Sequence, residues 1–408
     1  MSTESVSSSH QHSERVLSID VMRGCALIGM VLDHFQLYFG NDQAANTWPY
    51  FLMDHALGDW GAACFLMMMG MSQVLSTARR GFPDDSLLLR RAVIRSLYIF
   101  GIGLLMLALT WGPSQLWQWD ILTLMGFATV VLYGCRSLRS RAILLSAAGL
   151  GLAAPILRGT TEFAAYWGGG LRNVPFISEY LPGAYVEPIA KYHVIWQVKP
   201  IVLGFLANGY FPLFPWLMFP LIGFVLGRRI VEGKARGDVL HLFVLGASLA
   251  TAGLATAYAA RGAPAAAVIG GFIAPLSFSP DSSSMVLFQT GMVLASYSFL
   301  FYFFDVLKIG NAAEGHFGRL LSLTSRFSLS FYFLHYLIIG WTLLAVYLVS
   351  GQYRISSLMN DIPALACGLA AIVALEVTLY LWQKTRGRYS LEWVLALLTA
   401  KVAPDDRK

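Results

Sequence analysis

The feature that most constrains this chain is a succession of apolar segments, each about 20 residues long, separated by shorter polar connections. A helix of this length spans the hydrocarbon core of a bilayer, where every backbone hydrogen bond must be satisfied within the protein. Only 13% of the residues are charged, whereas about 25% are charged in a typical soluble domain. The sequence therefore predicts an integral membrane protein.

Ten segments have the length and hydropathy of membrane-spanning helices. The predicted fold is all-α: a polytopic integral membrane helix bundle of about ten transmembrane helices over 17–384, with a structured exoplasmic loop at 158–200. A disordered polar N-terminus at 1–16 precedes it, and an interfacial helix with a charged tail follows at 385–408. Three prolines in the sixth segment predict a kink or a broken start. The ten segments are 17–39, 57–77, 92–111, 117–135, 141–157, 205–227, 238–260, 284–307, 324–349 and 361–384.

Clusters of basic residues predict the orientation, since Lys and Arg accumulate on the cytoplasmic side of membrane proteins. With the N-terminus inside, the clusters at 79–95, 136–141, 228–236 and 384–388 all fall in cytoplasmic loops. Shifting a single span breaks this alternation, so we expect both termini to be cytoplasmic. The basic residues left outside are Arg158, Arg172, Lys191, Lys199, Arg261 and Arg354.

Several functional classes are disfavoured by the composition and the motifs. The net charge of +6 resides in the topological clusters, so it does not indicate nucleic-acid binding. The four cysteines form no CxxC pair and no Cys/His cluster, so neither a disulfide framework nor a metal site is expected. The chain lacks a Walker motif and the paired Gly/Pro-broken segments of an inverted-repeat transporter, which makes transport less favoured without excluding it.

The first span, 17–39, carries Asp20, Arg23, Asp33 and His34, although an Asp or Arg at a helix centre costs about 2.5–3.5 kcal/mol on insertion. Arg23 and His34 lie within about 20° of one helix face and about 16 Å apart along the axis. Histidine is the side chain best suited to proton transfer near neutral pH. The structural alternatives are a snorkelling Asp20–Arg23 pair and a buried Asp33–His34 pair.

A second polar group, Asp54, His55 and Asp59, stands where the second span begins. His55 and Asp59 are four residues apart, so on a helix the carboxylate could orient the imidazole and raise its basicity. Helix capping by either aspartate is the alternative. For Asp120, near a predicted helix start, and His335, in the middle of a later span, a capping or structural role competes with a functional one.

The stretch RVLSIDVMRGCALIGMVLDHF resembles the opening of a bacterial family of membrane proteins of the heparan-α-glucosaminide N-acetyltransferase type. It is similar, more loosely, to the wider superfamily of integral membrane acyltransferases. GYFPLFPWLMFPLIGFVLG, SRFSLSFYFLHYLIIG and GRYSLEWVLALLT are similar to later segments of the family, in the expected order. The resemblance implies a ten- or eleven-helix bundle in the bacterial inner (plasma) membrane. It would move an acyl group, expected to be acetyl, from cytoplasmic acyl-CoA to a sugar hydroxyl or amine at the exoplasmic face, without a metal.

The resemblance also implies catalytic residues. In the wider superfamily the histidine that ends the first motif is the catalytic candidate, and His34 matches it, with Asp33 beside it. In the heparan-type enzymes the active histidine lies in the loop before the second span and is oriented by an aspartate; His55 and Asp59 are the nearest matches. Because the spacing between His55 and Asp59 departs from the family pattern, both histidines remain candidates for the base.

Donor and acceptor sites are predicted at opposite ends of the bundle. Guanidinium groups pair well with phosphate, so basic residues near the cytoplasmic ends are predicted to hold the donor, although topology alone also explains them. These residues are Arg23, Arg79, Arg80, Arg91 and Arg95. For the acceptor we predict contacts with a second set, whose tryptophans could equally form an interfacial aromatic belt. That set is Trp60, Trp117, Asp120 and His335.

The expected partners are membrane lipid and a carbohydrate or glycoconjugate acceptor, and no nucleic acid. The oligomeric state stays open, a homodimer included. The rival interpretation is a membrane transporter or carrier that uses the buried His, Asp and Arg residues as a proton or substrate path. A third is a relative that keeps the fold and has lost activity.

Overall fold

The computed structural model describes residues 16–40, 58–80, 84–161, 198–260, 272, 274–278, 281–309, 315–350 and 358–402. Within these ranges the chain forms helices, turns and one isolated bridge between Phe278 and Asp281. Eight helical segments of the described residues are long and apolar enough to cross a membrane, which confirms the predicted all-α polytopic bundle. The N-terminal residues 1–15 and most of the predicted loop, at 162–197, lie outside the described residues.

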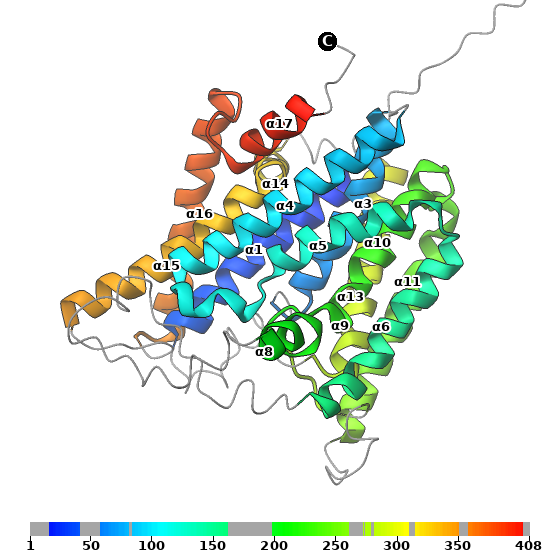
Figure 1. The fold of residues 1–408 in the computed structure, drawn as a ribbon, viewed down its shortest axis with the longest axis horizontal. Coiled ribbons are helices and arrows are strands. Elements are labelled where there is room, and N and C mark those ends of the chain that lie inside the picture. Colours follow the sequence, from blue (N-terminus) through cyan, green and yellow to red (C-terminus); the bar gives the residue numbers. More distant parts are fainter. Residues whose placement is uncertain are drawn as a thin grey trace, which may run out of the picture.

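In the part of the chain that the structure describes, the bundle (Figure 1) is built from ten longer helices and several short elements. The longer helices are α1 (Leu17–Phe39), α3 (Asp59–Arg80), α4 (Asp85–Thr110), α5 (Ile121–Gly134), α6 (Ser140–Thr160), α10 (Met218–Val231), α11 (Ala235–Ala260), α13 (Ser283–Phe301), α15 (Ser328–Ser350) and α16 (Asp361–Lys384). The short elements are η3 (Pro113–Gln118), η4 (Cys135–Ser137), α8 (Val198–Leu203), η7 (Gly204–Asn208), α9 (Leu213–Trp216), η8 (Tyr302–Val306), α14 (His316–Arg326) and α17 (Leu391–Val402).

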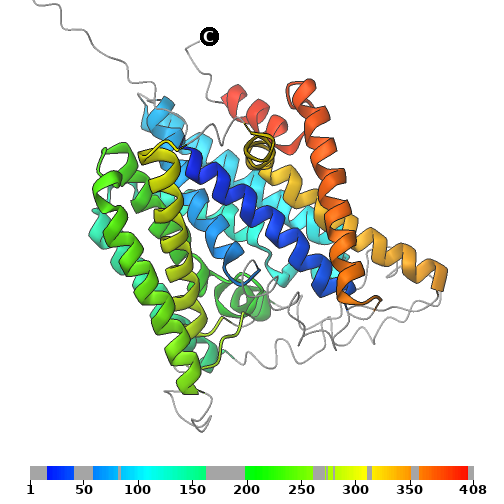
Figure 2. The same ribbon diagram turned by 180° about the vertical axis from the view of Figure 1, so that it is seen from behind.

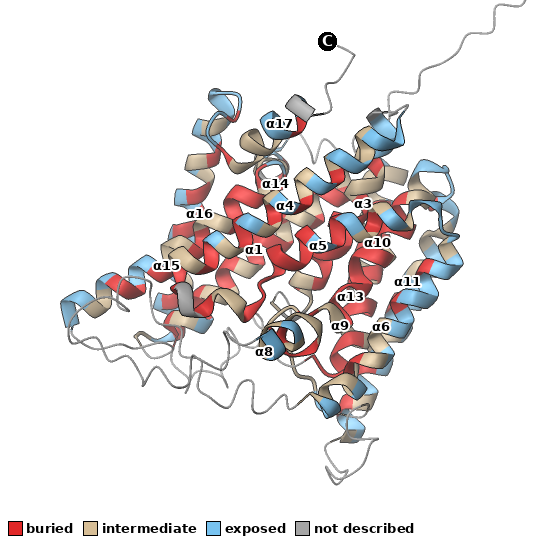
Figure 3. Cartoon of the chain, in the orientation of Figure 1, coloured by how far each residue is buried: buried red, intermediate tan, exposed pale blue. Residues whose placement is uncertain are grey.

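Helix α1, the predicted first span, runs through the middle of the bundle. In Figure 2 it crosses the centre with α13 on one side and α16 on the other, and it also contacts α3, α14 and α15. Buried residues are concentrated in these central helices, whereas α6 and α11 expose much of their surface (Figure 3). The most polar of the predicted spans is therefore the one surrounded by protein, which keeps its ionisable side chains away from lipid.

Glycines allow the closest helix contacts. A Cβ on Gly223 of α10 would overlap the carbonyl of Met67 in α3, and one on Gly70 of α3 would overlap the carbonyl of Pro220. Helices in membranes associate through such small residues because lipid offers no hydrophobic driving force between them. The α3–α10 contact therefore depends on backbone-to-backbone packing.

Several predicted boundaries differ from the structure. The span predicted at 117–135 begins as a helix only at Ile121, because η3 precedes it and Trp119 takes a left-handed φ of 62°. The span predicted at 324–349 is divided at Phe327, where α14 ends and α15 begins. The predicted broken start of the proline-rich segment is confirmed, since α8, η7, α9 and α10 are separate helical pieces. A helix also forms at the predicted C-terminal position, as α17.

We expect Gly223→Ala to destabilise the protein by about 1–3 kcal/mol, because the added methyl group forces α3 and α10 apart. The melting temperature in detergent measures this effect. Gly149→Ala in α6 is the matched control, since a Cβ at Gly149 meets no atom within 4 Å. Equal melting temperatures for the two variants would contradict the importance of the α3–α10 contact.

Candidate functional site

A cavity of about 280 Å³ lies among α1, α3, α4, α5 and α15, at the His34 end of α1. We call it the histidine cavity. Its polar lining residues include Asp33, His34, Gln118 and Asp120. The remaining wall is apolar or aromatic, and its aromatic members are Tyr38, Phe65, Trp111, Tyr210, Phe211, Phe278, Tyr332 and Tyr336. A chamber lined by hydrophobic and aromatic side chains, with a few convergent polar groups, is the usual form of a small-molecule site.

Two histidines from distant parts of the sequence meet beside this cavity: His34 lines it, whereas His335, predicted as a substrate contact, lies behind His34 and is not among the lining residues. Nδ1 of His34 in α1 lies 3.0 Å from Nε2 of His335 in α15. The rings stack at an interplanar angle of 20°, and His335 is fully buried. The sequence predicted His34 as catalytic and His335 as a separate substrate contact, so their pairing is a finding of the structure.

The donor and acceptor in this contact depend on the tautomers of the two rings. Among the described residues, the buried Nδ1 of His335 has no hydrogen-bond partner. In the tautomer of His34 that carries its proton on Nδ1, this N–H donates to Nε2 of His335. The Nε2 lone pair of His34 is then available for chemistry.

Asp120 serves as both a helix cap and a cavity wall. Its Oδ1 accepts a hydrogen bond of 2.9 Å from the backbone N–H of Leu122, which caps α5. Its Oδ2 accepts one of 2.8 Å from the hydroxyl of Tyr332, whose ring centroid lies 5.1 Å from that of His335. The capping role weighed for Asp120 is therefore present, and the same carboxylate ties α5 to the helix that carries His335.

Asp33 lines the histidine cavity where α3 begins. A Cβ on Gly58 would lie 2.8 Å from the carboxyl carbon of Asp33, so the absence of a side chain at Gly58 permits this approach. A carboxylate beside a helix N-terminus is also favoured by the helix dipole. His55 and the side chain of Asp59 lie outside the described residues, and their predicted pairing stays a prediction.

The predicted aromatic acceptor residues lie elsewhere. Trp60 packs, partly buried, against the hydrophobic core, and the ring of Trp117 contacts that of Trp119, 5.4 Å between centroids. Neither lines the histidine cavity. Sequence reasoning missed Tyr332 and Tyr336, whose signal was their spacing of three and one residues from His335 in FYFLHY.

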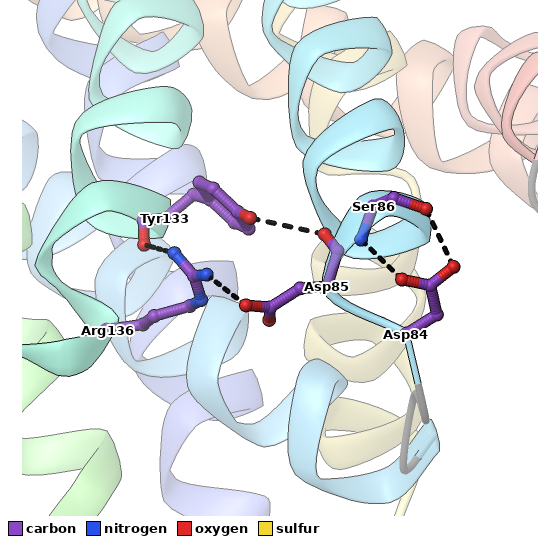
Figure 4. Close-up of polar contacts among 5 residues, drawn as sticks. All are labelled: Asp84, Asp85, Ser86, Tyr133 and Arg136. Carbon is purple, nitrogen blue, oxygen red and sulfur yellow. Dashed lines mark hydrogen bonds and ion pairs between the residues drawn. The ribbon is translucent and has the colours of Figure 1, made fainter.

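A second cavity, also about 280 Å³, lies towards the opposite end of α3, and we call it the arginine cavity. Its basic lining residues are Arg91, Arg95, Arg136 and Arg228. The guanidinium of Arg136 lies 4.0 Å from the ring centroid of Tyr133 and forms an exposed ion pair of 2.6 Å with Asp85 (Figure 4). The hydrogen bond to Asp85 and the charge of that carboxylate raise the pKa of Arg136. Two predicted donor residues, Arg91 and Arg95, thus share one cavity.

A third cavity, of about 270 Å³, surrounds the other end of α1 and is called the Arg23 cavity. Arg23 donates hydrogen bonds to the hydroxyl of Ser72 and, at 3.4 Å, to the carbonyl of Met68. It also donates at 3.5 Å to the hydroxyl of Ser325, which donates to Asp20 at 2.7 Å. The other lining residues include Ser76 and a further predicted donor residue, Arg79, whereas the side chain of Arg80 lies outside the described residues.

The Arg23 cavity and the histidine cavity follow one another along the same two helices. On α3, residues 58, 61, 62 and 65 line the histidine cavity, and residues 72, 75, 76 and 79 continue that face into the Arg23 cavity. Fully buried Met68 lies between the two sets, and its carbonyl is bonded to Arg23. On α1, less than one turn separates Arg23 from Ala26 of the histidine cavity. The two cavities therefore lie one after the other along α1 and α3, with about two turns of α3 between their lining residues.

Comparison with known proteins gives one family. The sequence model of the family described as "Heparan-alpha-glucosaminide N-acetyltransferase, catalytic" matches residues 15–256. This region contains α1, α3, α4 and α5, which supply much of the histidine cavity, and it ends before α15 and His335. No curated protein matches the chain.

We expect Tyr332→Phe to lower stability by about 1–3 kcal/mol, because it leaves the buried Oδ2 of Asp120 without this donor. Thermal denaturation in detergent tests this value. Tyr258→Phe, on the exposed surface of α11, is the control. A Tyr332→Phe protein as stable as the parent would show that the contact does not hold α5 to α15.

Proposed function

The chain belongs to the heparan-alpha-glucosaminide N-acetyltransferase catalytic family, and on this premise we propose that it is an acyl-CoA-dependent membrane acyltransferase. It transfers an acyl group, expected to be acetyl, from the cytoplasm to a hydroxyl or amine of a carbohydrate or glycoconjugate at the exoplasmic face of a bacterial inner membrane. The observation that carries the proposal is the His34–His335 pair, in which His34 lines the histidine cavity, while the Arg23 cavity lies further along the same two helices.

His34 is the proposed base. Its Nε2 takes the proton of the acceptor hydroxyl or amine while the acceptor oxygen or nitrogen attacks the thioester carbonyl. As the tetrahedral intermediate collapses, the carbon–sulfur bond breaks and the imidazolium of His34 returns its proton to the departing thiolate. With Nδ1–H of His34 as the donor in the 3.0 Å contact, Nε2 of His335 orients the ring and stabilises its positive charge, as a triad aspartate does for its histidine.

A two-step route uses the same geometry. Nε2 of His34 attacks the donor thioester, coenzyme A leaves, and the acceptor then displaces the imidazole from an acyl-histidine. In both routes Asp33, His34, Asp120 and the aromatic wall face the acceptor, whose ring can lie against the aromatic side chains. Acyl-enzyme formed from donor alone distinguishes the two routes.

The donor enters, in this proposal, from the Arg23 end of α1, which the distribution of basic residues assigns to the cytoplasm. The arginine cavity and the Arg23 cavity share Ser76 on α3, so guanidinium groups flank the last turns of that helix on two sides. These groups suit the phosphates of coenzyme A. The thioester arm then passes Arg23 and Met68 to reach His34, about 16 Å from Arg23 along α1.

A transporter is the second candidate, because the two cavities that follow one another along α1 and α3 could conduct a proton or a solute. Binding of coenzyme A to the purified protein separates the two functions. Acyl transfer requires this binding, and transport of an unrelated solute does not.

We expect His34→Ala to reduce transfer of radiolabelled acetyl groups from acetyl-CoA by about 10²- to 10⁴-fold, the usual contribution of a general base. His335→Ala should reduce it less, because His34 itself remains. Binding of coenzyme A should persist in both variants, and His241→Ala on the exposed face of α11 is the control. Acetyl transfer at the parent rate by a folded His34→Ala protein would show that His34 is not the base.

We expect the double variant Arg91→Gln, Arg95→Gln to weaken coenzyme A binding about tenfold or more, since each charge-assisted hydrogen bond contributes about 1.5–3 kcal/mol. Titration calorimetry at two salt concentrations measures the loss, which should shrink at high salt. Arg388→Gln, an exposed basic residue in the predicted cytoplasmic cluster at 384–388, is the control. Unchanged affinity would place the donor phosphates outside the arginine cavity.

A further inference from the structure

The C-terminal helix α17 holds the start of the helix that carries His335. The carboxylate of Glu392 accepts hydrogen bonds from the backbone N–H groups of Leu329 at 2.8 Å and Ser330 at 2.9 Å. Its second oxygen accepts from the hydroxyl of Ser330 at 2.5 Å. In turn, the backbone N–H of Leu391 donates to the Ser330 hydroxyl at 2.9 Å. All four contacts join α17 to the first turn of α15.

These contacts cap the start of α15 from outside the helix. The first N–H groups of a helix have no partner within the helix, and a negative charge beside them is favourable. Helix α15 begins at Ser328, directly after the break at Phe327 that ends α14. An acid more than 60 residues away in the sequence thus satisfies the donors at this break.

The same break is attached to α1 on its other side. Ser325, near the end of α14, donates to Asp20 of α1 at 2.7 Å and accepts from Arg23 at 3.5 Å. The junction between α14 and α15 at Phe327 is therefore held on both sides. Ser325 bonds it to α1, and Glu392 bonds the start of α15 to α17. The axial position of α15 relative to α1 is fixed there.

That axial position sets the geometry of the two imidazoles. His335 lies five residues beyond Ser330, about 7.5 Å along α15. A rigid helix transmits a shift at its first turn to His335, where the contact with His34 spans 3.0 Å. Displacements of about 1 Å near reacting groups can cost about 100-fold in rate.

We propose that Glu392 is a positioning residue for the His34–His335 pair: by capping α15 from α17, it holds His335 in register with His34. The inference rests on the proposed acyltransferase function, in which this pair acts on the acceptor. It assigns to the terminal GRYSLEW segment a role in the site, although Glu392 does not line the histidine cavity.

The test compares Glu392→Ala, Glu392→Gln and the parent. We expect Glu392→Ala to lower kcat by about 10- to 100-fold while the KM for acetyl-CoA stays the same, because the arginine-lined cavities are untouched. Glu392→Gln should recover much of this loss, since its amide oxygen still accepts from Leu329 and Ser330. The loss should also shrink in a His335→Ala background, because the group being positioned is gone.

Hydrogen exchange provides a readout that does not depend on activity. We expect Glu392→Ala to accelerate exchange of the amides at 328–336 and to leave α11 unchanged. Asp238→Asn is the control, since Asp238 is an acid in the first turn of α11 that pairs with Arg229 and should show the reverse pattern.

Three results would overturn the inference, and the first two are exchange at 328–336 that does not change and faster exchange with kcat unaltered. An equal loss of kcat and of coenzyme A binding would show general unfolding instead and would also overturn it. If the parent protein transfers no acyl group while the exchange result holds, the proposed function fails and the tether between α17 and α15 stands, so the two failures are distinguishable.

Discussion

The hydrogen bond between two imidazoles inside the bundle is the interaction on which the rest of the arrangement depends. Polar side chains at this depth must be paired within the protein, since neither lipid nor bulk water can satisfy them. Helix α1 carries most of these groups, so it must lie in the centre, where each neighbour offers a partner. The pairs are His34 with His335 of α15, Asp20 with Ser325 of α14, Arg23 with Met68 of α3, and Gln36 with Asp361 of α16.

Irregular backbone occurs beside the histidine cavity, and the cavity explains why it is tolerated. Non-helical chain at membrane depth is stable only where it is buried in protein or lines a polar space. The N–H groups of Tyr210 and Phe211 donate to the carbonyls of Gln118 and Trp119, at 2.9 and 3.0 Å. These two hydrogen bonds pair backbone groups of two non-helical segments with each other. Three of the four residues, Tyr210, Phe211 and Gln118, also line the cavity. The breaks in the helices thus supply the wall of the site.

The sequence predicted those features that depend on neighbouring residues in the chain, such as the positions of apolar helices and the polar residues within them. Hydropathy located the eight described helices that are long and apolar enough to cross a membrane, whereas the predicted spans 17–39 and 117–135 are not among them. Polar residues in the first helix drew attention to His34 and Asp33, which line the histidine cavity. Periodicity gives the face of a helix but not its neighbour, so the partnership of His34 with His335, 301 residues away, could not be read from it. The same limit applies to Glu392, whose function as a cap depends on α15 lying beside α17. Predicted helix ends were wrong where the backbone leaves the helical conformation inside an apolar segment. At Trp119 a left-handed φ interrupts the apolar segment predicted at 117–135, so that α5 begins only at Ile121.

The proposed transfer needs a path between the Arg23 cavity and the histidine cavity, yet an open polar channel would conduct protons and ions. Arg23 places a positive charge at the start of this path, and such a charge is a barrier to protons and cations. Met68 is fully buried and lies on α3 between the lining residues of the two cavities, with an unbranched side chain that can change rotamer at little cost. In the proposed function, these two residues therefore close the path to ions between the two cavities.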